Sequence, residues 1–365
     1  MRYPIPQHRA SEIQAVLHAL DGAERVVLTT HLNADGDGTG CQAALVSLLR
    51  DRGCEVRIIN PTPFPDLFRF LLPDPDPVLE ATDPDAAAWC EAADLCIVVD
   101  TGEVGRIGRV KPMVDSLPKV VIDHHPEGDS PIEGVYLRDI SAAAAGELVL
   151  DLVRTVDGPW SRSVIEGLYV ALLTDTGSFR FSNTTAGAHR AAAELVERGA
   201  NPDELHRQVY GSVPLRRYQL LERTLPTLRQ SDDGRVAWMT VSLADFQELG
   251  CDASDLEGLT DYPRGLAGVE VAILFRELER GVKLSFRSNG RVDVNALARE
   301  FDGGGHVRAA GALVQGSLDE VRSRVMERVA EGVARELAGE SGGPVAGGEV
   351  EGERDAAGSG AGRER

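Results

Sequence analysis

Three apolar, β-branched segments of this chain each run directly into acidic or imidazole side chains. RVVLTT (25–30) leads to His31, LCIVVD (95–100) ends at Asp100, and KVVIDHH (119–125) ends at Asp123, His124 and His125. Runs that are apolar on both faces are typical of parallel strands buried between helices. The carboxyl ends of such strands share one edge of the sheet, where ligands bind. The pattern therefore predicts an α/β domain with a mainly parallel sheet flanked by helices.

A length of 365 residues is more than one ordinary core needs, so two domains are expected. Apolar periodicity predicts helices over 141–156 and 161–174, and the interruptions at Asn201-Pro202 and Pro214 divide a helical region behind them. RVAWMTVS, VEVAILFRE and GVKLSFRS predict strands of a smaller α/β domain, and Ser317 with Glu320 predicts the capped start of its last helix. The predicted divisions are a first domain (1–185), a helical connector (186–230), a second domain (231–338) with an active-site cleft between the two, and a disordered, acidic, Gly-rich tail (339–365).

The balance of acidic and basic residues indicates which binding partners are unfavourable. With 38 Lys and Arg against 58 Asp and Glu, the net charge of −20 opposes binding to long duplex nucleic acid. The five cysteines are scattered without a C-x-x-C pair, which argues against disulfides and zinc knuckles. Neither a signal segment nor a run of about 18 apolar residues is present, so no membrane contact and a cytoplasmic location are expected.

The segment after the first predicted strand, HLNADGDG, concentrates one imidazole and two carboxylates in a glycine-containing turn. Taken singly, Asp37 is equally typical of a helix cap, Asp100 of a turn cap, and the double histidine of a structural pair. Four such loops at the edge of one sheet favour a metal cluster instead. The predicted ligands are His31, Asp35, Asp37, Asp100, His124 and Asp175.

The ligand types indicate the metal and the chemistry. Oxygen and imidazole ligands without thiolate suit hard or borderline ions, and six side chains exceed the need of one tetrahedral zinc. We therefore expect two divalent ions, Mn²⁺ first and Mg²⁺ as the alternative. Two such ions can activate water and balance charge on a phosphoryl group, which predicts phosphoester hydrolysis.

These motifs resemble those of the DHH phosphoesterase family, H-x-x-x-D-x-D, D, D-H-H and D, in the same order. The resemblance implies one metal held by His31, Asp35 and Asp100, and another held by Asp37, Asp100, His124 and Asp175. It further implies that Asp123 orients a histidine and that His125 contacts the scissile phosphate or assists the leaving oxygen as a catalytic group.

The segment LSFRSNGRVDVNALAREFDGGGHVRAAG (284–311) resembles the domain associated with this family. The resemblance implies that Gly303, Gly304, Gly305, His306 and Arg287 bind a terminal nucleotide, which agrees with the affinity of glycine backbone and arginine for phosphate. A glycine-rich hairpin turn is the structural alternative. Arg180 and Arg264 are further candidate substrate contacts.

Within the family, the two-domain length and the acidity favour the branch that hydrolyses short oligoribonucleotides and removes phosphate from 3′-phosphoadenosine 5′-phosphate. A linear or cyclic dinucleotide such as pApA or cyclic di-AMP is the alternative substrate, and a nucleotide-binding regulator without catalysis is the alternative from another class. A homodimer is expected by analogy with the family.

Overall fold

The computed structural model describes residues 5–211, 214–256 and 258–339. The chain divides into two compact units, residues 1–212 and 213–365. Of the tail predicted over 339–365, all but Gly339 lies outside the described residues. Among the described residues, no helix is long and apolar enough to cross a membrane.

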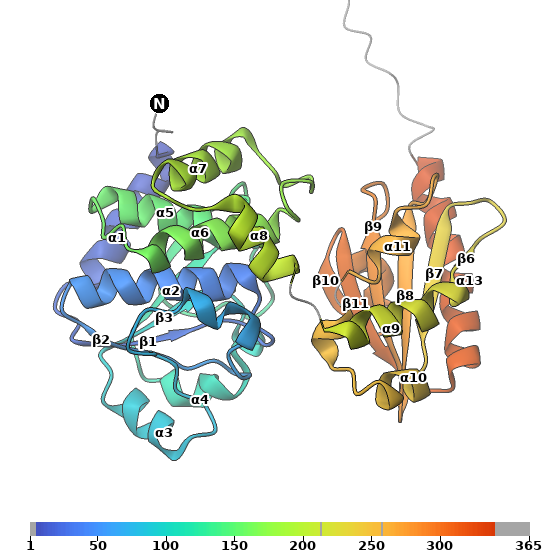
Figure 1. The fold of residues 1–365 in the computed structure, drawn as a ribbon, viewed down its shortest axis with the longest axis horizontal. Helices are drawn as coiled ribbons and strands as arrows, with labels where there is room; N and C mark the ends of the chain where they lie inside the picture. The colour runs from blue at the N-terminus through green and yellow to red at the C-terminus, as the bar shows by residue number, and fades with distance from the viewer. Residues whose placement is uncertain (1–4, 212–213, 257, 340–365) are drawn as a thin grey trace, which may run out of the picture. The chain divides into compact units, whose positions relative to one another are not determined.

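The first unit is built on a sheet of five parallel strands in the order β2-β1-β3-β4-β5 (Figure 1). This confirms the parallel sheet predicted from the apolar runs. The strands are β1 (Arg25–Thr29), β2 (Glu55–Ile58), β3 (Leu95–Val99), β4 (Lys119–Asp123) and β5 (Val135–Arg138).

Helices cover both faces of this sheet. Alternate strand residues face opposite sides, so Leu28 and Ile97 join the larger core and Val27 and Val98 join the smaller one. The larger face carries α1 (Gln7–Ala19), α2 (Gly36–Asp51), η1 (Asp66–Leu71), α5 (Ala145–Thr155), α6 (Arg162–Asp175), α7 (Ala186–Glu197) and α8 (Pro202–Tyr210). The smaller face carries α3 (Pro84–Glu91), η2 (Val104–Val110) and α4 (Lys111–Val114).

The second unit contains a mixed sheet of six strands in the order β10-β11-β9-β8-β7-β6. β7 and β8 are parallel and the other pairs are antiparallel. The strands are β6 (Arg229–Gln230), β7 (Val236–Val241), β8 (Val271–Leu278), β9 (Gly281–Ser288), β10 (Gly304–His306) and β11 (Ala309–Val314). The predicted α/β character of the second domain is confirmed.

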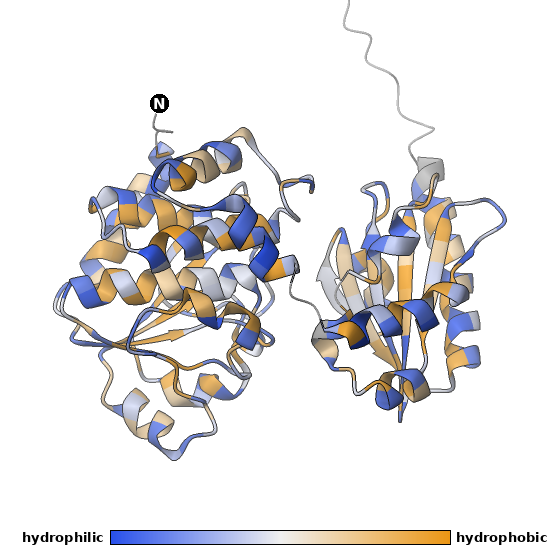
Figure 2. Cartoon of the chain, in the orientation of Figure 1, coloured by the Kyte–Doolittle hydropathy of each residue, from blue (hydrophilic) through white to orange (hydrophobic). Residues whose placement is uncertain are grey.

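Helices also lie on both faces of the second sheet, and the hydropathy colouring of Figure 2 shows α13 with one apolar side. Val321, Val325, Val329 and Val333 of that helix are buried against the sheet, as their helical spacing predicts. The helices are α9 (Leu215–Thr224), η3 (Leu225–Thr227), α10 (Leu243–Glu248), η4 (Ala253–Leu256), α11 (Asp261–Arg264), α12 (Val294–Arg299) and α13 (Leu318–Gly339).

The segment expected as a connector, 186–230, is shared between the units. Asn201 caps α8 with Pro202 in its first turn, and Pro214 precedes α9. α7 and α8 belong to the first unit, where Leu195 and Leu205 join its core, whereas Leu220 of α9 packs in the second.

Helices α2 and α6 pack with direct backbone contact. A Cβ placed on Gly40 would lie 2.2 Å from the carbonyl oxygen of Gly167, and one on Gly167 would lie 2.6 Å from that of Gly40. The two glycines therefore permit an approach that any side chain would prevent. Because α2 carries Asp37 and α6 ends at Asp175, this contact also sets the spacing of two predicted ligands.

We expect Gly40→Ala to lower the free energy of unfolding by about 1–3 kcal/mol, because the added methyl group would force the two helices apart. Urea denaturation measures this change. Gly105→Ala is the matched control, since a Cβ there meets no atom within 4 Å. Equal stability of the two variants would contradict the packing argument.

Candidate metal centre

Asp35 caps the helix that follows the first strand. Its Oδ1 accepts hydrogen bonds from the backbone N–H groups of Asp37, at 3.0 Å, and Gly38, at 3.2 Å. Asp35, and not Asp37, is therefore the N-cap of α2, because its extended backbone turns the side chain onto the first turn.

Asp37 instead reaches the start of α5, more than 100 positions along the chain. Its Oδ2 accepts from Ala145 N at 2.7 Å and its Oδ1 from Gly146 N at 2.9 Å. Ala144 at the cap position of α5 provides no side-chain hydrogen bond, so the carboxylate serves that helix in its place. A negative charge at a helix N-terminus is favourable, which partly offsets the cost of burying this carboxylate.

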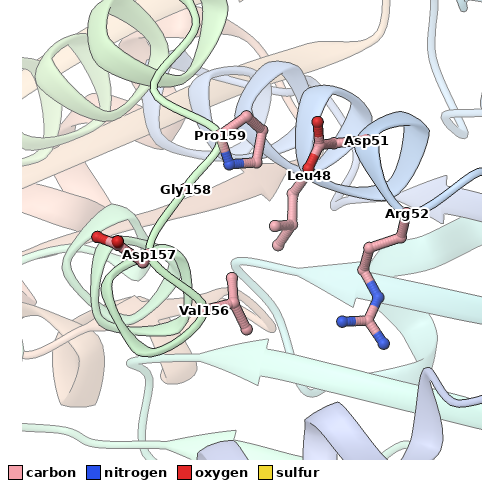
Figure 3. Close-up of a pocket in the computed structure, with 7 residues that line it drawn as sticks. All are labelled: Leu48, Asp51, Arg52, Val156, Asp157, Gly158 and Pro159. Atoms are coloured by element: carbon pink, nitrogen blue, oxygen red, sulfur yellow. The ribbon is translucent and has the colours of Figure 1, made fainter.

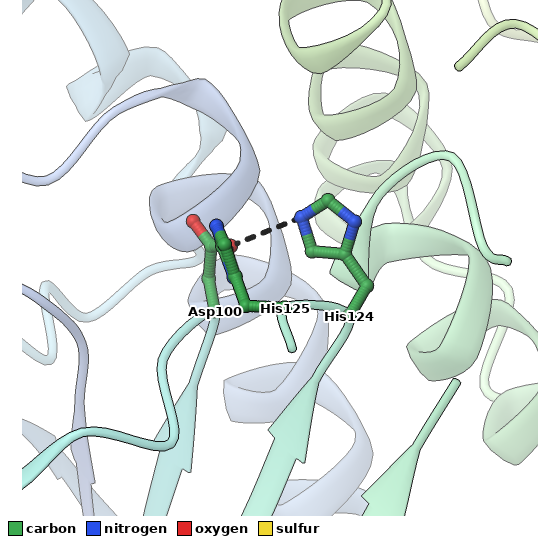
Figure 4. Close-up of side chains that lie close together, drawn as sticks. All are labelled: Asp100, His124 and His125. Carbon is green, nitrogen blue, oxygen red and sulfur yellow. Dashed lines mark ion pairs between the residues drawn. The ribbon is translucent and has the colours of Figure 1, made fainter. Parts of the chain in front are cut away.

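Asp100 stands between two histidines at the end of β3. Its Oδ2 lies 3.2 Å from His31 Nε2 and its Oδ1 lies 3.5 Å from His124 Nε2, the contact drawn in Figure 4. Its backbone has a φ of 59°, a left-handed conformation that is unusual outside glycine. The strained residue thus presents its two oxygens to two different imidazoles.

Backbone carbonyls fix the protonation pattern of both histidines. Nδ1 of His31 lies 2.9 Å from Leu32 O, and Nδ1 of His124 lies 3.2 Å from Ala142 O. Because a carbonyl oxygen only accepts, each Nδ1 carries a hydrogen and each Nε2 faces the carboxylates. This is the orientation in which a protein holds an imidazole for a metal ion.

Asp123 and His125 form a pair next to this group. Asp123 Oδ1 accepts from His125 Nδ1 at 2.8 Å and from His125 N at 3.2 Å. Asp123 thus holds the ring of His125, the arrangement expected of a residue that orients a histidine. His125 Nδ1 also lies 3.7 Å from Asp100 Oδ1.

Asp175, the last residue of α6, is held by a residue that sequence reasoning missed. Asn183 Nδ2 donates to Asp175 O at 3.0 Å and to Asp175 Oδ2 at 3.3 Å, and also to Ala143 O at 2.9 Å. The signal in the sequence is only an asparagine in the turn-rich segment after the helix, FSNTT, which is too common to single it out.

The structure brings all six predicted ligands together in groups that could hold metal ions. One group is His31, Asp35 and Asp100, another is Asp37, His124 and Asp175, and a third is Asp100, His124 and His125. In each group the ligand atoms lie within 4.8 Å of one another. Asp100 and His124 are common to more than one group, so the groups form a single centre.

The environment of His124 fits a bound cation. Its Nε2 lies 3.8, 3.5 and 3.6 Å from oxygens of Asp37, Asp100 and Asp175, yet within the described part of the chain it has no hydrogen-bond partner. A buried ring nitrogen that faces three carboxylates is unfavourable unless a positive charge, either a proton or a metal ion, lies between them. The donor set of oxygens and imidazole nitrogens is the one that divalent ions such as Mn²⁺ and Mg²⁺ accept.

The pKa values of the centre reflect its excess of negative charge. Burial opposes the charged form of His31 and His124, but their contacts with Asp100 and its neighbours raise both pKa values to about 10. Burial and the nearby carboxylates raise the pKa of Asp175 to about 7 and that of Asp37 well above its usual range. Without metal, protons on these groups supply the compensating charge.

The predicted nucleotide-binding residues lie in the second unit. Gly304, Gly305 and His306 form β10 at the edge of the sheet, antiparallel to β11, so the glycine segment is part of a hairpin. Gly303 immediately precedes it. In the register of the sheet, Arg287 pairs with Ala309, which pairs with His306. Arg287 and this edge are therefore separated by one strand.

Arg287 donates from Nη1 to Phe286 O at 3.0 Å, and burial lowers its pKa. In the described parts of the chain it forms no ion pair with a carboxylate within 4.0 Å. The other two candidate arginines have structural contacts: the exposed Arg180 donates to Gly177 O at 2.8 Å, and Arg264 pairs with Asp261 at 3.1 Å.

Figure 3 shows a pocket in the first unit. It is formed where α2 ends and where the chain passes from α5 to α6. Its described lining contains none of the predicted site residues and consists of Leu48, Asp51, Arg52, Val156, Asp157, Gly158 and Pro159.

Comparison with known proteins agrees with this geometry. Residues 25–172 match the sequence model of the DHH family, N-terminal domain, and residues 234–335 match that of the DHHA1 domain. The chain is 32% identical over 321 residues to the bifunctional oligoribonuclease and PAP phosphatase NrnA of Thermus thermophilus, covering 86% of this chain and 91% of that protein. The chain therefore belongs to the DHH family of phosphoesterases and is a hydrolase.

Two further relatives extend the comparison. The bifunctional oligoribonuclease and PAP phosphatase NrnA of Bacillus subtilis is 29% identical, with 81% of this chain and 91% of that protein covered. The crystal structure of an exopolyphosphatase-related protein from Bacteroides fragilis superposes with a TM-score of 0.80 at 24% identity, covering 90% of this chain and 97% of that one. The latter likeness shows the fold.

We expect the metal-free protein to lose stability as the pH rises from about 6.5 to 10. His31 and His124 have pKa values of about 10 in the folded chain but about 6.5 when unfolded, so the folded state binds more protons throughout this interval. Their contribution is complete below about pH 6.5 and is lost as the pH passes 10. Urea denaturation in EDTA at four pH values measures the slope.

His31→Gln and His124→Gln should each flatten this dependence, whereas His18→Gln, at an exposed position, should leave it unchanged. A slope that is the same in all four proteins would refute the assignment.

Proposed function

We propose that the chain is a two-metal phosphoesterase that hydrolyses short oligoribonucleotides and removes phosphate from 3′-phosphoadenosine 5′-phosphate. The observation that carries the proposal is the position of Asp100, whose two oxygens face His31 and His124 on opposite sides. A carboxylate in this position can bridge two ions, one held with His31 and Asp35 and the other with Asp37, His124 and Asp175. The similarity to the NrnA proteins supports the choice of substrates.

Two divalent ions at these residues would lower the pKa of a water nucleophile and balance charge on the phosphoryl oxygens. The protein's own groups orient and assist. Asp123 holds Nδ1 of His125, so Nε2 is the nitrogen that would meet the phosphate or the leaving oxygen. In this orientation the ring of His125 could exchange a proton with that oxygen.

Substrate binding is assigned to the second unit. Arg287 is a partly buried guanidinium without a described carboxylate partner, which favours an anion as its ligand. β10 lies at the edge of its sheet, where backbone N–H groups that face away from β11 can donate to a phosphate. We propose that a terminal nucleotide of the substrate binds to these groups. Arg180 and Arg264 remain weaker candidates, since each already has a structural contact.

The deciding experiment is an assay of EDTA-stripped protein on di-, tri- and 24-residue RNA, on 3′-phosphoadenosine 5′-phosphate, and on pApA and cyclic di-AMP. Mn²⁺, Mg²⁺ or no metal is added back. We expect metal-dependent cleavage of the dinucleotide and release of phosphate from the adenosine bisphosphate. Faster turnover of pApA or cyclic di-AMP would support dinucleotide hydrolysis as the function instead. Absence of turnover on every substrate would support a nucleotide-binding role without catalysis.

Asp100→Asn should lower kcat/KM on every substrate by more than about a hundredfold, because it removes the shared charge without changing the size of the side chain. Steady-state kinetics measures the loss. Asp115→Asn, at an exposed carboxylate paired with Lys111, is the matched control and should retain full activity. Full activity of Asp100→Asn would overturn the two-metal proposal.

Gly304→Ala should raise the KM for both substrates by roughly tenfold while leaving stability and metal binding unchanged. A Cβ at Gly304 would come no closer than 4.0 Å to Asn295 Oδ1, so the fold tolerates it, but it would obstruct a phosphate that approaches the backbone. Gly305→Ala is unsuitable for this test, because φ is +148° there and its Cβ would lie 2.5 Å from Ala309 O. An unchanged KM for Gly304→Ala would exclude the glycine segment from the binding site.

A further inference from the structure

One short segment of the first unit contacts two members of one predicted metal group directly and the third through Asn183. Residues 139–146, here named the β5–α5 segment, accept from His124 Nδ1 through Ala142 O and from Asn183 Nδ2 through Ala143 O. The same amide of Asn183 donates to Asp175. The N–H groups of Ala145 and Gly146 donate to Asp37.

The other metal group is held differently. His31 Nδ1 donates to Leu32 O, and Asp35 accepts from the first turn of its own helix. In the described ranges, the hydrogen bonds of His31, Asp35 and Asp100 do not involve the β5–α5 segment. The segment therefore orients Asp37, His124 and Asp175 without direct contact with the first group.

Arg9, on α1, forms ion pairs with the first residue of the β5–α5 segment and with two residues of the helix that follows it. Its Nε donates to Asp139 Oδ2 at 2.6 Å, and its Nη1 donates to Glu147 Oε1 at 3.0 Å and Asp151 Oδ2 at 2.8 Å. Arg9 is only 2% exposed and is the largest fully buried side chain in the described chain. It lies outside residues 25–172, which match the family's N-terminal domain.

Two of the acidic partners of Arg9 also accept hydrogen bonds from the backbone of the segment. Asp139 Oδ1 accepts from Ser141 N at 2.8 Å and from Ser141 Oγ at 2.6 Å. Glu147 Oε2 accepts from Ala143 N at 3.2 Å. The carbonyl groups of Ala142 and Ala143 accept from His124 and Asn183. They thus lie in the stretch between Asp139 and Glu147, both of which Arg9 contacts.

A lysine cannot reproduce this arrangement. The planar guanidinium donates in several fixed directions, whereas an ammonium on a flexible stem is a single point charge. Loss of the guanidinium would also remove the ion pair of the buried Glu147, and Asp139 and Asp151 would keep only His8 and Arg154 as described ion-pair partners. This loss of charge compensation favours a local rearrangement of the segment.

We propose that Arg9 is a positioning residue that sets the affinity of one metal site, the site of Asp37, His124 and Asp175, and leaves the other unchanged. This inference rests on the proposed function, because it requires two metal ions. Helix α1 carries none of the predicted ligands, yet by this inference one of its residues sets the affinity of one of the two metal sites.

The test is a titration of the EDTA-stripped full-length protein with Mn²⁺, in which electron paramagnetic resonance measures free Mn²⁺. The wild-type protein should bind two ions. Arg9→Met and Arg9→Lys should weaken one of the two sites by about 10- to 100-fold, the range found for residues that orient metal ligands, and change the other by less than about twofold. If Arg9→Met fails to fold, Arg9→Lys alone decides.

Ile13→Ala is the matched control. Ile13 is fully buried on the same helix, so its truncation should destabilise α1 while keeping the contacts of Arg9. It should leave both affinities unchanged. Equal weakening of both sites in the Arg9 and Ile13 variants, or no weakening in the Arg9 variants, would overturn the inference. Fewer than two ions bound by the wild-type protein would instead refute the proposed two-metal function.

Discussion

Four carboxylates lie close together at one edge of the parallel sheet in the first unit, and the fold has to compensate their mutual repulsion. Asp37 and Asp100 are almost completely buried there, and Asp35 and Asp175 lie beside them. Such a group is unstable unless positive charge compensates it. Three sources are visible in the fold: the imidazoles of His31 and His124, the N-terminus of α2 at Asp35, and the N-terminus of α5 at Asp37. The remaining excess of negative charge is what favours divalent cations.

This requirement explains the close packing around the centre. Asp37 can reach the N–H groups of α5 only if α2 and α5 converge, and Asp175 can approach His124 only if α6 lies tightly against α2. The contact between Gly40 and Gly167, and the absence of a side chain at Gly146, where a Cβ would lie 2.5 Å from that of Ala171, permit this convergence. The close packing of α2, α5 and α6 therefore also determines the positions of Asp37 and Asp175.

The sequence predicted what depends on strand patterns and missed what depends on contacts distant in the chain. The ends of β1, β3 and β4 could be predicted because buried parallel strands are apolar up to their last residue. The reach of Asp37 to α5, the amide of Asn183 and the buried cation of Arg9 could not, because each joins elements 40 to more than 130 positions apart. Arg9 also stands in a helix of mixed composition, where a buried arginine has no distinctive pattern. The roles of the ligands themselves remain predictions.

The candidate sites of the two units carry opposite kinds of charge. Around the centre of the first unit, the described carboxylates are paired chiefly with imidazoles and helix N-termini, so an anionic substrate would be repelled by the residues alone. In the second unit, Arg287 and the glycine backbone of β10 offer the converse: N–H donors and a cation that forms no ion pair within 4.0 Å among the described residues. Divalent ions would therefore have two roles, since they would reverse the charge of the first unit as well as activate water. The net charge of −20 itself disfavours long nucleic acids, so an anionic ligand has to be met by local positive charge.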